Sequence, residues 1–101
     1  MYQSDQVLVP HSSIQLGAPV GEGLHAIVNH GIMKLDEKPG CDVALKIFQY
    51  LRAEPPVGVV KAFIAELEII RHLKNEHIVQ FRAVQIEPKL TIIMEYMNRG
   101  R

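Results

Sequence analysis

The residue with the clearest chemical potential is Lys46, a lone cation in the apolar run 43–48. The run favours a strand and follows the turn signal Pro39-Gly40. Because side chains alternate along a strand, Lys46 is predicted to share a face with Ala44 and Phe48. An unpaired charge buried there is costly. Lys46 is therefore either an edge-strand lysine or a cation that a carboxylate holds in place for an anionic ligand.

The carboxylate that suits this cation is Glu66. Residues 59–73 have apolar side chains at three- and four-residue steps, which predicts a helix, and Glu66 lies on the margin of the apolar stripe. Glu68 is expected to face solvent. Taken alone, Glu66 is more typical of a solvated helix margin. Together with Lys46 it predicts an ion pair, which adds little stability by itself but positions the lysine for a ligand.

A glycine-rich turn, Gly21-Glu22-Gly23, comes before the lysine strand in the sequence. Glycine permits unusual backbone angles and lets N–H groups approach an anion such as phosphate. Two glycines in a turn are also common for purely structural reasons. The order of the three features, which is glycine turn, strand lysine and helix glutamate, is what favours an anion site.

The elements that must position these residues predict an α+β fold, a five-stranded, mostly antiparallel sheet with one packed helix. Pro55-Pro56 suits the start of the helix, and Asn75 suits its end. Three strands are expected before the helix and two after it, at residues 14–20, 26–33, 43–48, 78–81 and 90–94. Residues 1–12 are predicted to be a tail, and residues 13–101 a single lobe.

Composition narrows the classes of function. The chain has 101 residues, 48% of them hydrophobic, which suits one small core. Its 11 basic side chains equal its 11 acidic ones, so no nucleic-acid partner is predicted. The histidines and the single Cys41 lack zinc-site spacing, so no metal site is predicted. With no membrane span, no signal peptide and no internal disulfide, we expect a soluble, cytoplasmic domain.

Three motifs follow one another in the chain: Gly21-Glu22-Gly23-Leu24-His25-Ala26-Ile27-Val28, then Val43-Ala44-Leu45-Lys46, then Glu66 in a helix. In this order they resemble the N-terminal lobe of a eukaryotic protein kinase. The resemblance continues through Glu76–Phe81 and Ile92–Gly100, and it covers roughly residues 14 to 101.

The kinase group is indicated by shorter stretches. Val9–Ile14 and Val28–Ile32 are similar to tyrosine kinases, including the activated-Cdc42-associated type, and this is the group we favour. The helix and Glu95-Tyr96-Met97 are also similar to kinases that head MAP kinase cascades.

The resemblance implies a role in ATP binding for each site residue. Gly21 and Gly23 would shape the loop over the phosphates. Lys46 would hold the α- and β-phosphates, and Glu66 would orient Lys46. The adenine contacts would be Val28, Ala44, the gatekeeper Met94, and the hinge residues Glu95 and Met97. Ile70 and Phe81 would belong to a hydrophobic spine.

Two departures from the kinase pattern qualify these roles. Ala26 stands where the loop usually has a third glycine, and His25 stands at the usually aromatic tip. The chain ends at Arg101 and contains neither His-Arg-Asp nor Asp-Phe-Gly. The resemblance therefore implies that the catalytic base, the Mg²⁺ ligands and the platform for the protein substrate belong to a missing lobe.

We thus expect the ATP-binding lobe of a protein kinase, which does not transfer phosphate alone. Two alternatives are a truncated or pseudokinase-like module that acts through protein contacts, and an unrelated α+β domain.

Overall fold

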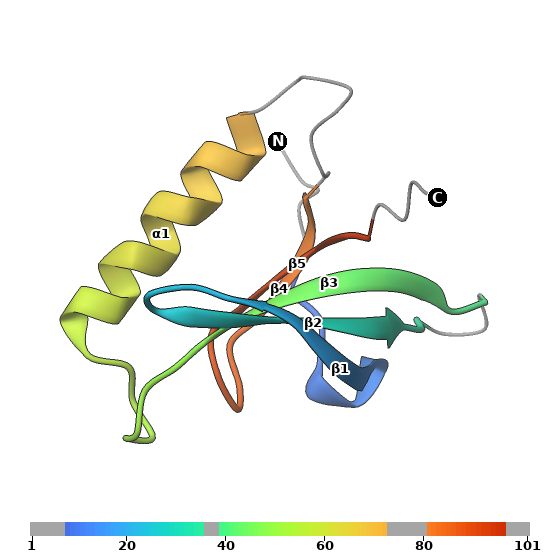
Figure 1. Ribbon diagram of the computed structural model, residues 1–101, viewed down its shortest axis with the longest axis horizontal. Helices are drawn as coiled ribbons and strands as arrows, with labels where there is room; N and C mark the ends of the chain where they lie inside the picture. Colours follow the sequence, from blue (N-terminus) through green and yellow to red (C-terminus); the bar gives the residue numbers. More distant parts are fainter. Residues whose placement is uncertain (1–7, 36–38, 73–80, 97–101) are drawn as a thin grey trace.

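The computed structural model describes residues 8–35, 39–72 and 81–96. Within them, five strands form one sheet and one α-helix packs against it (Figure 1). A short 3₁₀-helix, His11–Ser13, precedes the first strand. The elements follow in the order β1 (Ile14–Glu22), β2 (Ala26–Met33), β3 (Cys41–Phe48), α1 (Val57–His72), β4 (Phe81–Gln85) and β5 (Thr91–Glu95).

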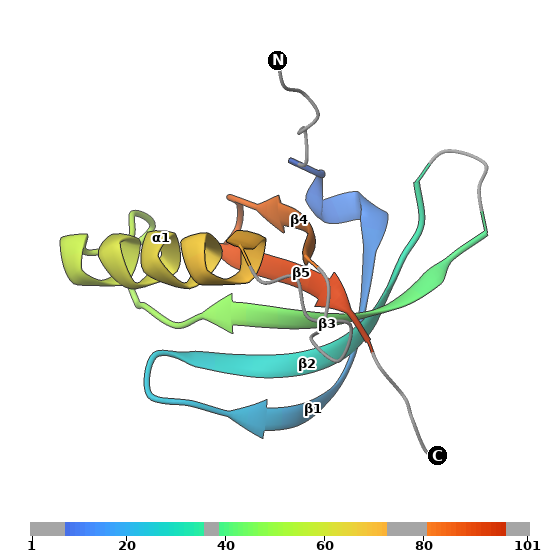
Figure 2. The same cartoon turned by 90° about the horizontal axis from the view of Figure 1, so that it is seen from above.

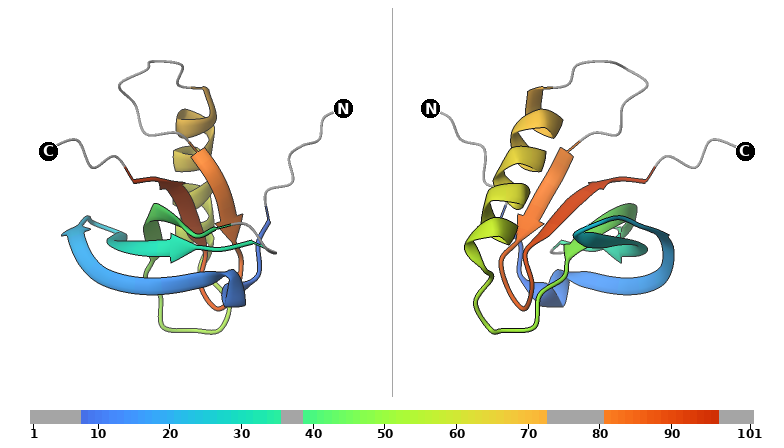
Figure 3. Two further views of the ribbon diagram at one scale, coloured as in Figure 1. Left: turned by 90° about the vertical axis from the view of Figure 1, so that its right-hand side faces the viewer. Right: turned by 60° about the vertical axis from the view of Figure 1, so that its left-hand side comes forward.

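The sheet has the spatial order β1-β2-β3-β5-β4, and every neighbouring pair is antiparallel. Figure 2 shows α1 lying along one side of this sheet, and Figure 3 shows how strongly the sheet twists between its two edges. The predicted α+β class is confirmed. No helix in the described ranges has the length and apolar character needed to cross a membrane.

Helix α1 begins directly after the predicted proline pair. The N–H groups of Val59 and Val60 both donate to the Pro56 carbonyl at 3.0 Å, which closes the first turn. Proline fits there because its missing N–H would have no partner inside the helix in any case. The helix starts two residues before the predicted position, and its apolar stripe faces the sheet as predicted.

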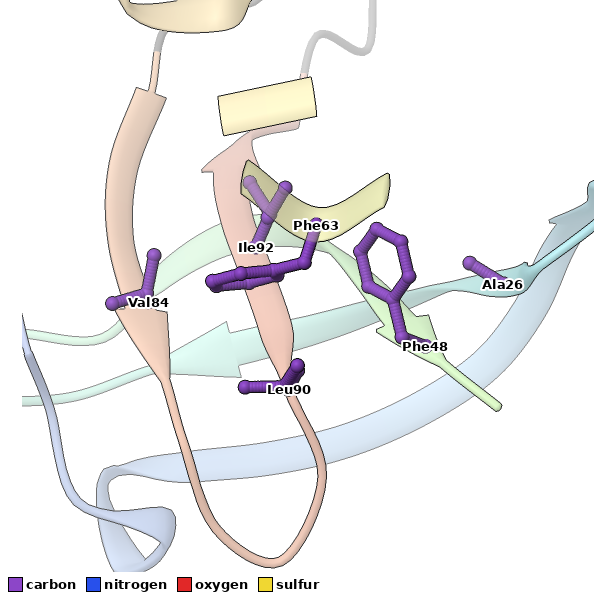
Figure 4. Close-up of a cluster of buried hydrophobic side chains, with 6 residues drawn as sticks. All are labelled: Ala26, Phe48, Phe63, Val84, Leu90 and Ile92. Atoms are coloured by element: carbon purple, nitrogen blue, oxygen red, sulfur yellow. The ribbon is translucent and has the colours of Figure 1, made fainter. Parts of the chain in front are cut away.

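The sheet buries side chains on both of its faces. On the helix side, Phe63 packs edge-on against Phe48, with ring centroids 5.6 Å apart and planes at 82°. The cluster on this face contains Ala26, Phe48, Phe63, Val84, Leu90 and Ile92 (Figure 4). The cluster on the opposite face contains Met33, Val43, Leu45, Ala83 and Ile93. The predicted alternation along β3 is therefore confirmed.

Strand β4 lies later in the chain than predicted. The prediction was residues 78–81, but β4 runs from Phe81 to Gln85, and residues 73–80 lie outside the described ranges. Ala83 and Val84 are buried in the two different clusters. Because this strand buries consecutive residues, it lacks the polar and apolar alternation that reveals a half-exposed strand.

Residues 8–10, which were expected to be part of a tail, pair with the edge of β4. Leu8 forms a parallel bridge with Val84, and the Val9 N–H donates to the Val84 carbonyl at 3.0 Å. The buried amide of Gln85 donates to the Pro10 carbonyl at 2.9 Å. These bonds cover an edge strand and satisfy a buried polar group. The domain boundary at residue 13 stays a prediction, but residues 8–10 are attached to the sheet.

Candidate functional site

An ion pair joins the sheet to the helix, as predicted. The Lys46 Nζ atom of β3 lies 2.8 Å from Glu66 Oε1 of α1, with the two side chains 26% and 38% exposed. Because β3 is the third of five strands, the edge-strand interpretation of Lys46 is wrong. A half-exposed pair contributes little net stability, since lost hydration offsets the attraction. Its main effect is to hold the lysine amine at one place on the sheet.

Two rows of paired residues place other predicted site residues on the same face of the sheet. One row contains Val28, Lys46 and Ile92. The next row contains His30, Ala44 and Met94. Residues directly opposite one another in antiparallel strands project to the same face. Val28, Ala44 and Met94 therefore share the helix-bearing face with Lys46.

The predicted turn at residues 21–23 is wrong in its bounds, because Gly21 and Glu22 belong to β1 and pair with Val28 and Ile27, so the chain turns at residues 23–25. In this glycine turn, residues 21–25, the glycines provide open space rather than unusual backbone angles. No glycine in the described ranges has a positive φ. A Cβ atom at Gly21 would meet nothing within 4 Å, and one at Gly23 would meet only the Ala26 carbonyl oxygen, at 3.7 Å. The Gly23 N–H already donates to that carbonyl at 2.8 Å. A phosphate group at this turn would therefore need N–H donors other than that of Gly23.

A pocket of about 300 Å³ lies between the turn, β3 and α1. Residues 23–26, Lys46, Phe48 and one side of α1 line it, including Glu66. This volume is at the small end for ligand sites and suits the phosphate groups of a nucleotide better than a whole nucleotide. Lys46 and Glu66 cancel each other in charge. His25 is the remaining ionisable side chain of the described lining.

A larger groove of about 1130 Å³ lies elsewhere, between residues 8–11, Ala53 and residues 86–88. It shares no lining residue with the Lys46 pocket. Its lining is mostly apolar, so it lacks the charged pair that makes the smaller pocket a candidate anion site.

The other predicted site residues are placed as follows. Glu95 is half-buried at the end of β5, where it pairs with Val43. Ile70 packs against the helix-side cluster, and Phe81 is the first residue of β4. Met97 lies outside the described ranges. The roles of all these residues in nucleotide binding stay predictions.

A polar cluster near the site was not predicted. His30 Nε2 lies 3.0 Å from Asp42 Oδ1, and the His30 ring lies 4.6 Å from the Tyr96 ring. Alternation along each strand places Asp42 on the face of Ala44 and His30 on the face of Val28. This pattern could have indicated that the two side chains lie on one face of the sheet. Recognising the contact also required the register between β2 and β3, which the sequence pattern does not specify. In the described ranges, no three His, Cys, Asp or Glu side chains gather as metal ligands would.

Comparison with known proteins identifies the family. The model of the family described as protein tyrosine and serine/threonine kinase matches residues 14–101. A probable serine/threonine-protein kinase of Dictyostelium discoideum is 36% identical over 79 residues, which are 78% of this chain and 3% of the relative. A second one from that organism is 27% identical over 92 residues, which are 91% of this chain and 10% of the relative.

Serine/threonine-protein kinase CTR1 of Arabidopsis thaliana is 32% identical over 99 residues, which are 95% of this chain and 11% of the relative. The chain thus spans 11% or less of the length of each of these three relatives. Their names leave the narrower resemblance to tyrosine kinases unconfirmed. The chain belongs to the protein tyrosine and serine/threonine kinase family, and its sheet and helix have the architecture of that family's N-terminal lobe.

Proposed function

We propose that this chain is the ATP-binding lobe of a protein kinase. The observation that carries the proposal is the Lys46–Glu66 pair, which lies in the pocket beside the glycine turn. Phosphate oxygens are bound by cations and by N–H donors, and a lysine amine provides three donors. Lys46 can therefore keep its bond to Glu66 and still donate to phosphate oxygens.

The other proposed contacts with ATP come from the glycine turn, the two rows of side chains and the residues at the end of β5. Gly21 and Gly23 leave space for the phosphates, and Val28 and Ala44 offer apolar surface to the adenine ring. Met94, Glu95 and Met97 complete the adenine end of the proposed site. When bound, ATP with Mg²⁺ supplies the phosphoryl group, and this chain's own residues bind and orient the nucleotide.

The acceptor and the remaining catalytic groups are also proposals. The 101 residues contain neither His-Arg-Asp nor Asp-Phe-Gly, so we propose that they bind ATP without transferring phosphate by themselves. The Mg²⁺ ligands and the surface for a protein substrate would come from residues outside this sequence. The names of the relatives favour serine or threonine as the acceptor. A cytoplasmic setting, where ATP is plentiful and the single Cys41 would stay reduced, fits this function.

An equilibrium titration with Mg-ATP tests the proposal. Lys46→Met is expected to weaken binding about tenfold or more, because a charged hydrogen bond contributes about 1.5–3 kcal/mol. The matched control is Lys61→Met, an exposed lysine of α1 that does not line the pocket. Equal affinities for the wild-type chain and Lys46→Met would contradict the proposal.

A second candidate function, a module that acts through protein contacts, is favoured by exposed apolar side chains on α1. Val57, Ile64 and Ile69 are all largely exposed. Sedimentation equilibrium distinguishes the two functions. A chain that binds no Mg-ATP but self-associates, and becomes monomeric with Ile64→Glu, would favour the second candidate. A monomeric chain that binds Mg-ATP would favour the first.

A further inference from the structure

Three side chains meet on the helix-bearing face, at the end of β2 and β3 that lies away from the glycine turn. We call His30, Asp42 and Tyr96 the strand-end cluster. His30 is on β2, Asp42 is on β3, and Tyr96 directly follows β5, which is the next strand of the sheet. The His30–Asp42 contact is 3.0 Å, and the His30 and Tyr96 rings are 4.6 Å apart and tilted by 41°. This ring distance is typical of aromatic packing.

The backbone reinforces the contact of the rings. The last pair between β3 and β5 is Val43 with Glu95, so Tyr96 is the first residue beyond the ladder. Its N–H still donates to the Asp42 carbonyl, at 3.4 Å. The Asp42 carbonyl therefore holds the Tyr96 backbone. The Asp42 carboxylate binds His30, whose ring packs against the Tyr96 ring. The cluster fixes the chain where it leaves the sheet.

Strand β1 lies close to the His30 backbone at Gly17. A Cβ atom at Gly17 of β1 would lie 2.7 Å from the His30 carbonyl oxygen and 3.7 Å from Nδ1 of its ring. The β1 backbone thus packs directly against His30, and a side chain at position 17 would collide with it. The Gly17 backbone therefore lies close to the His30 backbone, and the His30 side chain contacts Asp42.

The cluster borders the adenine end of the proposed site. His30 is the register partner of Ala44, and Ala44 is the partner of Met94. Tyr96 stands in sequence between Glu95 and Met97, the two residues proposed to offer backbone groups to adenine. A displacement of Tyr96 would move the adjoining Glu95 backbone relative to Ala44.

The same contacts contribute little to overall stability. The His30 and Asp42 side chains are 34% and 62% exposed, and contacts between exposed polar side chains contribute little to stability. Loss of the cluster should therefore change the local geometry more than the free energy of unfolding.

We propose that His30 and Asp42 are positioning residues for adenine, because they hold Tyr96 and so the backbone at the end of β5. This inference rests on the proposed ATP-binding function. It assigns the nucleotide site two residues that do not touch the phosphate pocket.

The test separates the two ends of the nucleotide. The 101-residue chain is titrated with Mg-ATP, with adenosine and with tripolyphosphate, and binding is followed by NMR. His30→Leu removes the ring and the bond to Asp42. We expect this variant to lower the affinities for Mg-ATP and for adenosine by the same factor, about three- to tenfold. The affinity for tripolyphosphate should stay unchanged. The Tyr96 amide resonance should shift in the ligand-free variant.

Two further variants separate positioning from a general structural role. His30→Phe keeps an aromatic ring against Tyr96 and should restore part of the adenosine affinity. Lys34→Gln, an exposed change just past the end of β2, is the matched control and should leave every affinity unchanged. The melting temperature of His30→Leu should stay within about 4 °C of the wild type, which corresponds to less than about 1 kcal/mol.

The outcomes distinguish this inference from the function on which it rests. If the wild-type chain binds neither Mg-ATP nor adenosine, the proposed function fails and the inference falls with it. If the wild-type chain binds both, and His30→Leu either leaves adenosine affinity unchanged or weakens tripolyphosphate equally, the inference alone is overturned.

Discussion

Lys46 and Glu66 meet at 2.8 Å between the third strand of the sheet and the middle of the helix. Glu66 thereby fixes the lysine amine relative to both layers of the fold. The pair lines a pocket with the glycine turn, so the structure holds a cation where an anion can enter.

Glu66→Gln should weaken Mg-ATP binding and barely change stability. The amide can still accept a hydrogen bond from Lys46, but it loses the charge that holds the amine. We expect about three- to tenfold weaker binding, and less than about 1 kcal/mol change in the free energy of unfolding, because the pair is partly exposed. Isothermal titration and urea unfolding measure the two quantities. Glu54→Gln, in an exposed loop, is the control; an equal effect there would contradict the role of Glu66.

His25→Lys should tighten the binding of phosphates. The charges of Lys46 and Glu66 cancel, so a permanent cation at position 25 makes the described pocket lining positive. We expect Mg-ATP affinity to rise about two- to fivefold, with adenosine affinity unchanged. His11→Lys adds the same charge outside the pocket. A similar gain from His11→Lys would show a nonspecific effect of net charge.

Phe63→Leu should destabilise the lobe. Phe63 is buried between the helix and the sheet and packs edge-on against Phe48, so the variant loses an aromatic pair and leaves a small void. We expect the free energy of unfolding, measured by chemical denaturation, to fall by about 1–2 kcal/mol. Ile64→Leu, at an exposed position on the same helix, should lower the free energy of unfolding by less than about 0.5 kcal/mol. Equal costs at the two positions would contradict the packing described for α1.

Gln85→Ala should loosen the segment before β1. The buried amide donates to the Pro10 carbonyl, and its removal leaves that carbonyl without this donor. We expect the free energy of unfolding to fall by about 1–2 kcal/mol. Hydrogen exchange should become faster at the Val9 amide, which donates to the Val84 carbonyl. Gln15→Ala, on the exposed strand β1, should change neither quantity. Unchanged exchange at Val9 would contradict the attachment of residues 8–10 through Gln85.

The central strand and the helix could be predicted because they follow simple periods. Lys46 interrupts a strand whose alternate residues are buried on opposite faces, and Glu66 interrupts a helical stripe. Each polar residue stands out against a regular apolar pattern. The sequence alone therefore predicts that these two residues pair.

The features that escaped prediction depend on contacts between distant segments. Gln85 binds Pro10 across 75 positions of sequence, so neither residue reveals the contact locally. β4 buries Ala83 and Val84 on opposite faces, which removes the usual alternation. The His30–Asp42 contact requires the register of two strands as well as their presence.

The most direct test of ATP binding maps the nucleotide onto the chain by NMR. Mg-ATP should shift the amide resonances of Gly21, Gly23, Val28, Ala44 and Lys46 together, with one saturating midpoint. Lys46→Met should abolish saturation at the same concentrations, while Lys61→Met should not. Shifts confined to the groove between residues 8–11 and 86–88, or identical shifts in the chain with Lys46→Met, would contradict the account.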